Sequence, residues 1–210
     1  MSLEMLGALD LFCQDEDAAR QKAVDAMKGW ESQRVPYRWG GHTTSGFDCS
    51  GAVVAAYIAA GMMPEKQRGQ FNAPDLYHSL SSVPIRAFLK PGDAVFYGSL
   101  LGGVSHVMMY VGDDKVCGAT GGGPKTLTKQ DAIDRDARVK TVSIDYRSDI
   151  RGYGRAPVGL DGAELKKSKA SAWPWVVGVP VVAAGTGAAL WASGVWRPEW
   201  VRKISPWSLP

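Results

Sequence analysis

Cysteine and histidine are scarce in this chain, and their scarcity limits the kinds of site that it can build. The 210 residues include only three cysteines and three histidines. An odd number of cysteines without paired spacing gives neither a disulfide framework nor a zinc-binding pattern. We therefore expect no metal site and no cofactor, and any cysteine or histidine chemistry must come from single residues.

A strong excess of charge of either sign is also absent. The formal net charge is +3, and charged residues make up 21% of the chain. Nucleic-acid-binding domains usually carry a dense basic face, so we expect no nucleic-acid partner. Hydrophobic residues make up 45%, a balance that is typical of globular proteins and argues against general disorder.

The N-terminus lacks the features of a secretory signal peptide. Such a peptide begins with basic residues and continues as an apolar run that ends in a small-residue cleavage site. Residues 1–17 instead contain five acidic side chains and no such run. We predict that the chain has no signal peptide.

Composition divides the chain into five stretches. We predict an N-terminal arm (1–14), a globular domain (15–156), a linker (157–172), an apolar segment (173–196) and a basic and aromatic tail (197–210). In the domain, helices are predicted at 17–30, capped by Asp15 or Asp17, and at 50–60. Candidate strands follow at 94–97, 106–111, 116–119, 139–144 and 150–155. Helices first and strands afterwards indicate an α+β fold.

Cys49 is the candidate nucleophile. It stands at the start of the second predicted helix, directly after Asp48, which could cap that helix. The free N–H groups and the dipole of a helix start stabilise a thiolate, so we expect the pKa of the thiol to be lowered. The small residues Ser50 and Gly51 would let a substrate approach, and the backbone N–H of Cys49 could contribute to an oxyanion hole.

His106 is the candidate base. It opens an apolar run that predicts a strand, and a neutral histidine near a cysteine can accept the thiol proton. It lies 57 residues beyond Cys49, so the prediction is that folding brings the two together. A buried structural cysteine and a scaffold histidine are the alternative interpretation. His78 is expected to be exposed, and His42 to be a surface residue or to border the cleft.

Four motifs in register resemble one family. They are PYRWGG (36–41), GFDCSG (46–51), LKPGDAVF (89–96) and SHVMMYVG (105–112). In order and spacing they are similar to the NlpC-type cell-wall peptidases, which are papain-like enzymes, and the resemblance covers about two-thirds of the chain. It implies a papain-like α+β domain in which N-terminal helices pack on an antiparallel sheet.

The resemblance also assigns roles by position. Cys49 would be the nucleophile, His106 the base, and Tyr37 the tyrosine beside the thiol that helps to stabilise the oxyanion. Asp48 and Ser50 would flank the nucleophile as supporting residues. The implied activity is hydrolysis of an amide in the peptide stem of peptidoglycan, often between D-glutamate and a diamino acid, so the stem peptide is the implied partner.

One position departs from the family pattern. The family usually places a third polar residue, commonly histidine, on the strand after the base, and that slot falls on Gly118, which has no side chain. A main-chain carbonyl, a water, Thr120 or Cys117 could orient the imidazole instead. Two alternatives therefore stay open: a weak or inactive structural tail protein with the same fold, and an amidase or acyltransferase that acts on another amide or on a lipid.

The C-terminal apolar segment, residues 173–196, contains no charged residue. As a helix it is long enough to cross a hydrocarbon core of ~30 Å, since ~20 residues suffice. Tryptophans near both ends and basic residues on both flanks favour a membrane anchor, with burial in a protein assembly or a simple hydrophobic tail as alternatives. Together with the missing signal peptide, this favours a phage or phage-like component of a virion or tail that acts in the cell envelope. Residues 173–210 would then contact a membrane or other tail proteins.

Overall fold

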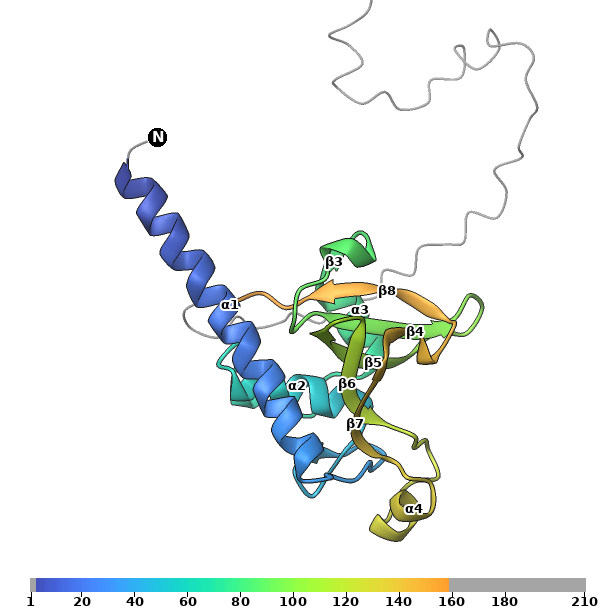
Figure 1. The fold of residues 1–210 in the computed structure, drawn as a ribbon. Coiled ribbons are helices and arrows are strands. Elements are labelled where there is room, and N and C mark those ends of the chain that lie inside the picture. Colours follow the sequence, from blue (N-terminus) through green and yellow to red (C-terminus); the bar gives the residue numbers. More distant parts are fainter. Residues whose placement is uncertain (1–2, 159–210) are drawn as a thin grey trace, which may run out of the picture. The chain divides into compact units, whose positions relative to one another are not determined.

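A computed structural model describes residues 3–158, which form an α+β domain (Figure 1). Its helices are α1 (Leu3–Ser32), α2 (Cys49–Ala59), α3 (Ala73–Ser79) and α4 (Lys129–Asp134). The main sheet contains β3 (Ser81–Val83), β4 (Ala94–Ser99), β5 (Gly103–Gly112), β6 (Lys115–Thr120), β7 (Arg138–Ser143) and β8 (Ile150–Arg155). The short strands β1 (His42–Thr43) and β2 (Gly46–Phe47) pair separately. The predicted α+β class and antiparallel sheet are confirmed.

Every neighbouring pair in the main sheet is antiparallel, in the order β3-β8-β4-β5-β6-β7. The side chains alternate between the two faces, as the two-residue period of a strand requires. One set joins the core shared with the helices: Ala94, Phe96, Val107, Met109, Cys117 and Ala119. The other set forms a second cluster on the opposite face: Val95, Tyr97, Met108 and Val116, closed by Ile144.

The helix that starts at Cys49 begins and ends for clear local reasons. Asp48 is its N-cap, and the carboxylate accepts a hydrogen bond from the backbone N–H of Gly51 at 2.6 Å. The helix ends next to Gly61, whose φ of +74° suits glycine. Nine of its eleven residues are buried, which explains the run of small apolar residues in the sequence.

The first helix differs from its prediction. It runs through Leu3–Ser32 without a break, so Asp15 and Asp17 are interior residues rather than caps. The predicted boundary between an arm and a domain near residue 14 is therefore not a break in the backbone. The physical reason is that residues 3–16 are mostly good helix formers and include no proline, so nothing in that stretch stops the helix.

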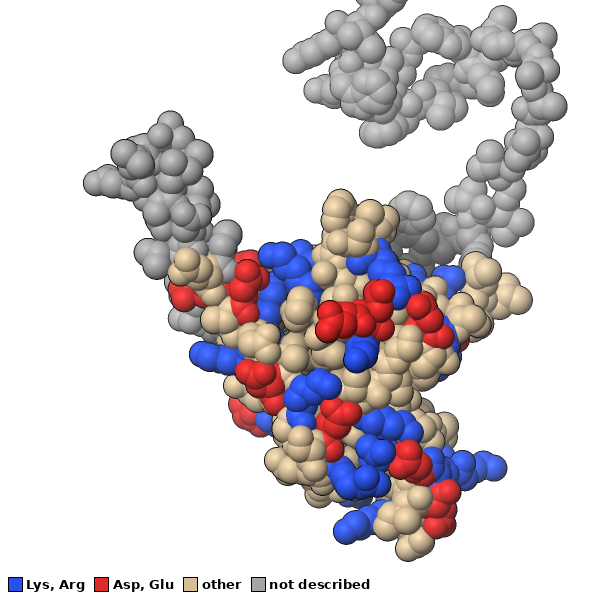
Figure 2. All heavy atoms as spheres, in the orientation of Figure 1, with Lys and Arg blue, Asp and Glu red and all other residues tan. Residues whose placement is uncertain are grey.

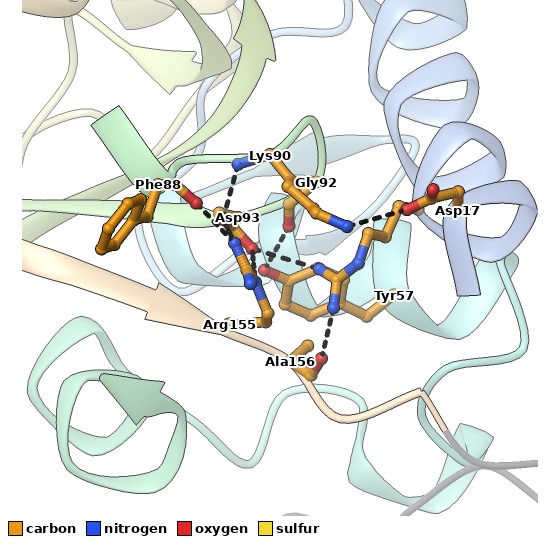
Figure 3. Close-up of polar contacts among 9 residues, drawn as sticks. Asp17, Tyr57, Phe88, Lys90, Gly92, Asp93, Arg155 and Ala156 are labelled. Carbon is orange, nitrogen blue, oxygen red and sulfur yellow. Dashed lines mark hydrogen bonds and ion pairs between the residues drawn. The ribbon is translucent and has the colours of Figure 1, made fainter. Parts of the chain in front are cut away.

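The LKPGDAVF motif has a structural role, shown in Figure 3. Asp93, directly before β4, is fully buried. Its carboxylate accepts hydrogen bonds from Arg20 (3.1 Å), Arg155 (2.9 and 2.6 Å) and the backbone N–H of Lys90 (2.8 Å). Arg20 lies on α1 and Arg155 on β8, so one carboxylate ties the N-terminal helix to two strands. Tyr57 of α2 joins the same region by donating to the carbonyl of Gly92 at 2.9 Å.

The surface seen in Figure 2 carries both signs of charge side by side. Exposed ion pairs of the described residues include those of Arg86 with Asp114 and Asp145. Within residues 3–158, no helix is both long and apolar enough to cross a bilayer. The predicted apolar segment (173–196), the tail (197–210) and all but the first two residues of the linker (157–172) lie outside the described residues.

Candidate active site

One cavity of about 510 Å³ contains the side chains that the sequence singled out. The predicted site residues that line it are Tyr37, Asp48, Cys49, Ser50 and His106. The start of α2 packs against β5, and the Cys49 thiol lies beside the backbone N–H of Val107, the residue after His106. Folding thus brings a thiol and an imidazole that are far apart in sequence to the same cavity.

Tyr37 is positioned by the edge of the main sheet. Its backbone N–H donates to the carbonyl of Ala137 at 2.9 Å, and Val35 accepts from the N–H of Val139 at the same distance. Residues 35–37 therefore run along β7, and this places the Tyr37 ring in the wall of the cavity. Burial raises the pKa of the Tyr37 hydroxyl, and the charges of Cys49 and Asp48 raise it further. The hydroxyl consequently stays protonated and can act as a donor.

Two glycine positions let the backbone close around the nucleophile. A Cβ at Gly51 would collide with the carbonyl oxygen of Gly41, and one at Gly122 would collide with the ring of Tyr37. The first contact lets the loop after residue 38 approach α2, where Asp48 N–H donates to Gly41 at 2.8 Å. The second places the Gly-rich loop at residues 121–124 along the cavity wall.

Burial dominates the electrostatics of Cys49. The residue is 9% exposed, and burial followed by the negative charge of Asp48 raises the pKa of the thiol to about 11. The N–H groups of Val107, Ser50 and Cys49 itself lower it, but by less. The expected lowering by the helix start is therefore wrong in direction, because desolvation and an adjacent carboxylate outweigh the helix terminus.

The pKa of His106 is shifted in the opposite direction, downward. Burial, and then the positive charge of Arg147, lower the pKa of the imidazole to about 4, while Asp149 acts in the opposite sense. At neutral pH the free site therefore holds a neutral thiol and a neutral imidazole. Such a pair can transfer a proton from sulfur to nitrogen when a substrate is bound, rather than storing a thiolate in advance.

Thiol alkylation tests this charge state. Because the thiol pKa lies near 11, we expect iodoacetamide to modify Cys49 at pH ~7 at least about 10²-fold more slowly than glutathione. The rate should climb as the pH approaches the thiol pKa. Peptide mapping by mass spectrometry assigns the modified cysteine. Modification of Cys49 faster than glutathione at neutral pH would show a preformed thiolate and contradict the assignment.

Position 118, where the family pattern places the orienting residue, supplies no side chain to orient His106. A Cβ at Gly118 would meet Met108, at 3.5 Å from its Cγ, rather than His106. The Cys117 thiol belongs to the helix-facing core, where it contacts Glu31 at 3.8 Å, so Cys117 is excluded as a substitute. The Nε2 atom of His106 is buried and has no hydrogen-bond partner within residues 3–158.

The remaining histidines lie outside this cavity. His78 is exposed, as predicted. His42 is also exposed, and it lines a separate cavity of about 240 Å³ together with Gly69 and Asp75. Within the described part of the chain, no cluster of three or more His, Cys, Asp or Glu side chains could hold a metal ion.

Sequence reasoning missed Arg147, which contributes the cationic side chain to the cavity. It follows the 3-10 turn η3 (Ile144–Tyr146) between β7 and β8, forms an ion pair with Asp149, and stands 5.6 Å above the centroid of the Tyr97 ring. No local motif marks it. Its role depends on β8 lying beside β4 in the sheet, which a single sequence does not reveal.

A cysteine at a helix start and a histidine on the adjoining strand of an antiparallel sheet are the arrangement that the resemblance to papain-like enzymes implies. Comparison with known proteins narrows this class. Residues 34–136 match the model of the NlpC/P60 family, so this part of the chain is a domain of that family.

Curated relatives and solved structures agree with the family. The chain is 43% identical over 100 residues to murein DD-endopeptidase MepH of Escherichia coli K12, covering 45% of this chain and 35% of that protein. It is 36% identical over 121 residues to peptidoglycan endopeptidase RipB of Mycobacterium tuberculosis H37Rv, covering 51% and 47%. A crystal structure of an NlpC/P60 family protein from Bacillus cereus ATCC 10987 shares the fold, with a TM-score of 0.50 and 22% identity over 65% of this chain and 40% of that chain. The chain thus spans less than half the length of each of these relatives.

Proposed function

We propose that this chain is a peptidoglycan endopeptidase that hydrolyses an amide bond of the cell-wall stem peptide, with Cys49 as nucleophile and His106 as base. The observation that carries the proposal is that the two side chains line one cavity, with the thiol against the strand that bears the imidazole. The names of MepH and RipB, an endopeptidase of murein and one of peptidoglycan, support the substrate class.

The chemistry follows from the two neutral groups. His106 takes the proton of the Cys49 thiol as the sulfur attacks the amide carbonyl, and the carbonyl oxygen becomes an oxyanion. The backbone N–H of Cys49 and the Tyr37 hydroxyl stabilise that charge. The imidazolium then gives its proton to the leaving amine as the C–N bond breaks. A water, deprotonated by His106, hydrolyses the remaining thioester and releases the carboxylic acid and the thiol.

The pH dependence of kcat/KM follows from the pKa of His106. The base must be neutral, and its pKa is lowered to about 4, so activity is present above that pH and is lost as the pH falls through it. We expect kcat/KM to be level between about pH 5 and pH 8, with an acid limb near pH 4. Far-UV circular dichroism at each pH checks that the chain remains folded. An acid limb near pH 6.5, the ordinary histidine value, would contradict the assigned environment.

Digestion of purified peptidoglycan tests the function itself. The 210-residue chain should release fragments with new amino groups, and mass spectrometry should locate the broken bond within the stem peptide. Absence of any product would favour the inactive structural protein. Cleavage only of another amide or of a lipid would favour an amidase or acyltransferase.

We further propose the association with a virion or phage tail, and the membrane contact of residues 173–210, on sequence grounds alone. The apolar segment is the supporting observation. Co-sedimentation of the chain with phage particles, and separately with lipid vesicles, tests the two contacts. A chain that remains in the supernatant in both cases would lead us to abandon them.

A further inference from the structure

The Nε2 atom of His106 is a buried polar atom that the proposed mechanism leaves without a partner. It has no hydrogen bond within the described residues. In a neutral imidazole one ring nitrogen carries the hydrogen and the other accepts. Because Nε2 is buried, Nδ1 is the nitrogen left to share a proton in the cavity, and that requires the hydrogen to be on Nε2. A group that accepts the Nε2–H would select this tautomer.

A second buried polar atom without a hydrogen-bond partner belongs to a ring that neighbours His106. The hydroxyl oxygen of Tyr146 is buried and makes no hydrogen bond of normal geometry within residues 3–158. The Tyr146 ring meets the imidazole edge-on, with ring centroids 6.4 Å apart. The side chain of Thr120 lies close enough to lower the pKa of Tyr146, although burial raises that pKa by more. Buried polar groups in native proteins nearly always have a hydrogen-bond partner. Two such groups without a partner, on neighbouring rings, therefore favour a hydrogen bond between them.

Two other polar neighbours of His106 are committed elsewhere. Tyr97 pairs with His106 across β4 and β5, and its ring centroid is 6.0 Å from the imidazole. Its hydroxyl, however, donates to the carbonyl of Ile144 at 2.9 Å. The carboxylate of Asp149 accepts two hydrogen bonds from Arg147. Within residues 3–158 the Tyr146 hydroxyl has the Thr120 side chain beside it but makes no hydrogen bond of normal geometry.

We propose that the Tyr146 hydroxyl accepts a hydrogen bond from the Nε2–H of His106 in the working site, and so performs the orienting role that Gly118 cannot. Tyr146 is a positioning residue, because it does not line the cavity that holds Cys49. The inference rests on the proposed function for its kinetic consequences, but not for the tautomer that it assigns.

The kinetic consequence follows from the charge that develops on His106. When the imidazole takes the Cys49 proton it becomes a cation, and its Nε2–H bond to Tyr146 strengthens. Tyr146→Phe removes the acceptor and keeps the ring. We expect kcat to fall by about 10- to 100-fold, as for loss of a hydrogen bond to a charged group. KM should change little, because Tyr146 does not contact the substrate.

Nitrogen-15 NMR of the histidine rings at neutral pH tests the proposal without any substrate. In the wild-type chain His106 should be in the Nε2–H tautomer, and Tyr146→Phe should convert part of it to the Nδ1–H form. Tyr97→Phe is the matched control, since it removes a hydroxyl from an equally close ring that is bonded elsewhere. The control should leave the tautomer unchanged.

Three results would overturn the inference: a wild-type His106 in the Nδ1–H form, an unchanged tautomer in Tyr146→Phe, or a tautomer that responds to Asp149→Asn instead. A wild-type chain with the predicted tautomer behaviour but no peptidoglycan cleavage would leave the inference standing and remove the proposed function. The two failures are therefore distinguishable.

Discussion

Replacing Cys49 with alanine is expected to reduce peptidoglycan cleavage by at least about 10³-fold, because the sulfur of Cys49 is the atom that forms the acyl-enzyme in the proposed mechanism. The change removes one sulfur atom from the cavity and leaves its walls in place. The Asp48 cap and the helix start depend on backbone groups and on the carboxylate, so the fold should be retained. Release of amino groups from peptidoglycan, measured against time for the two chains, gives the ratio.

Cys117→Ala is the matched control for this substitution. It also removes a buried thiol, but one that packs in the helix-facing core and contacts Glu31. We expect its activity to remain within about threefold of wild type, since it neither lines the cavity nor touches His106. Equal losses of activity in the two variants would mean that Cys49 acts through packing and is not the nucleophile.

Replacing Asp93 with alanine is expected to lower the free energy of unfolding by about 3–5 kcal/mol, the usual cost of breaking a buried ion pair from one side. The carboxylate is fully buried, and the side chain of Arg20 is 5% exposed. Among the described residues, removing Asp93 leaves the buried Arg20 guanidinium with only a long hydrogen bond to the carbonyl of Ala156, at 3.4 Å. Urea unfolding monitored by far-UV circular dichroism measures the change.

Asp145→Ala provides the comparison at the surface. Asp145 also pairs with an arginine, Arg86, but its side chain is 62% exposed. Exposed pairs contribute at most about 1 kcal/mol, so this variant should unfold close to wild type. A loss of similar size in both variants would indicate that burial is not the source of the Asp93 effect.

Much of the fold was predictable because local signals coincide with tertiary contacts. The buried helix was readable from its small apolar run, its Asp48 cap and the glycine after it, and all three are observed. The strands at residues 94–97 and 150–155 were predicted close to their observed bounds. The start of α1 was missed, because the acidic residues that suggested a cap are equally compatible with a helix interior.

Only those residues of the candidate site that lie within a sequence motif could be predicted. The positions of Cys49 and His106 follow from their motifs, whereas the pKa of the thiol depends on how deeply folding buries it. Burial reverses the shift expected from the helix start. Arg147 reaches the cavity, and Tyr146 the His106 ring, through strand neighbours distant in sequence, and counting to Gly118 could not reveal them. Tertiary placement, rather than residue type, decides these features.

Trapping the covalent intermediate tests the central claim most directly. The 210-residue chain should be mixed with a synthetic stem peptide, quenched with acid during turnover, and digested for mass spectrometry. We expect a peptide containing Cys49 whose mass is raised by the acyl portion of the substrate, and no such adduct on Cys117. Cleavage of the stem peptide that proceeds with Cys49 unmodified, and at an undiminished rate in Cys49→Ala, would contradict it.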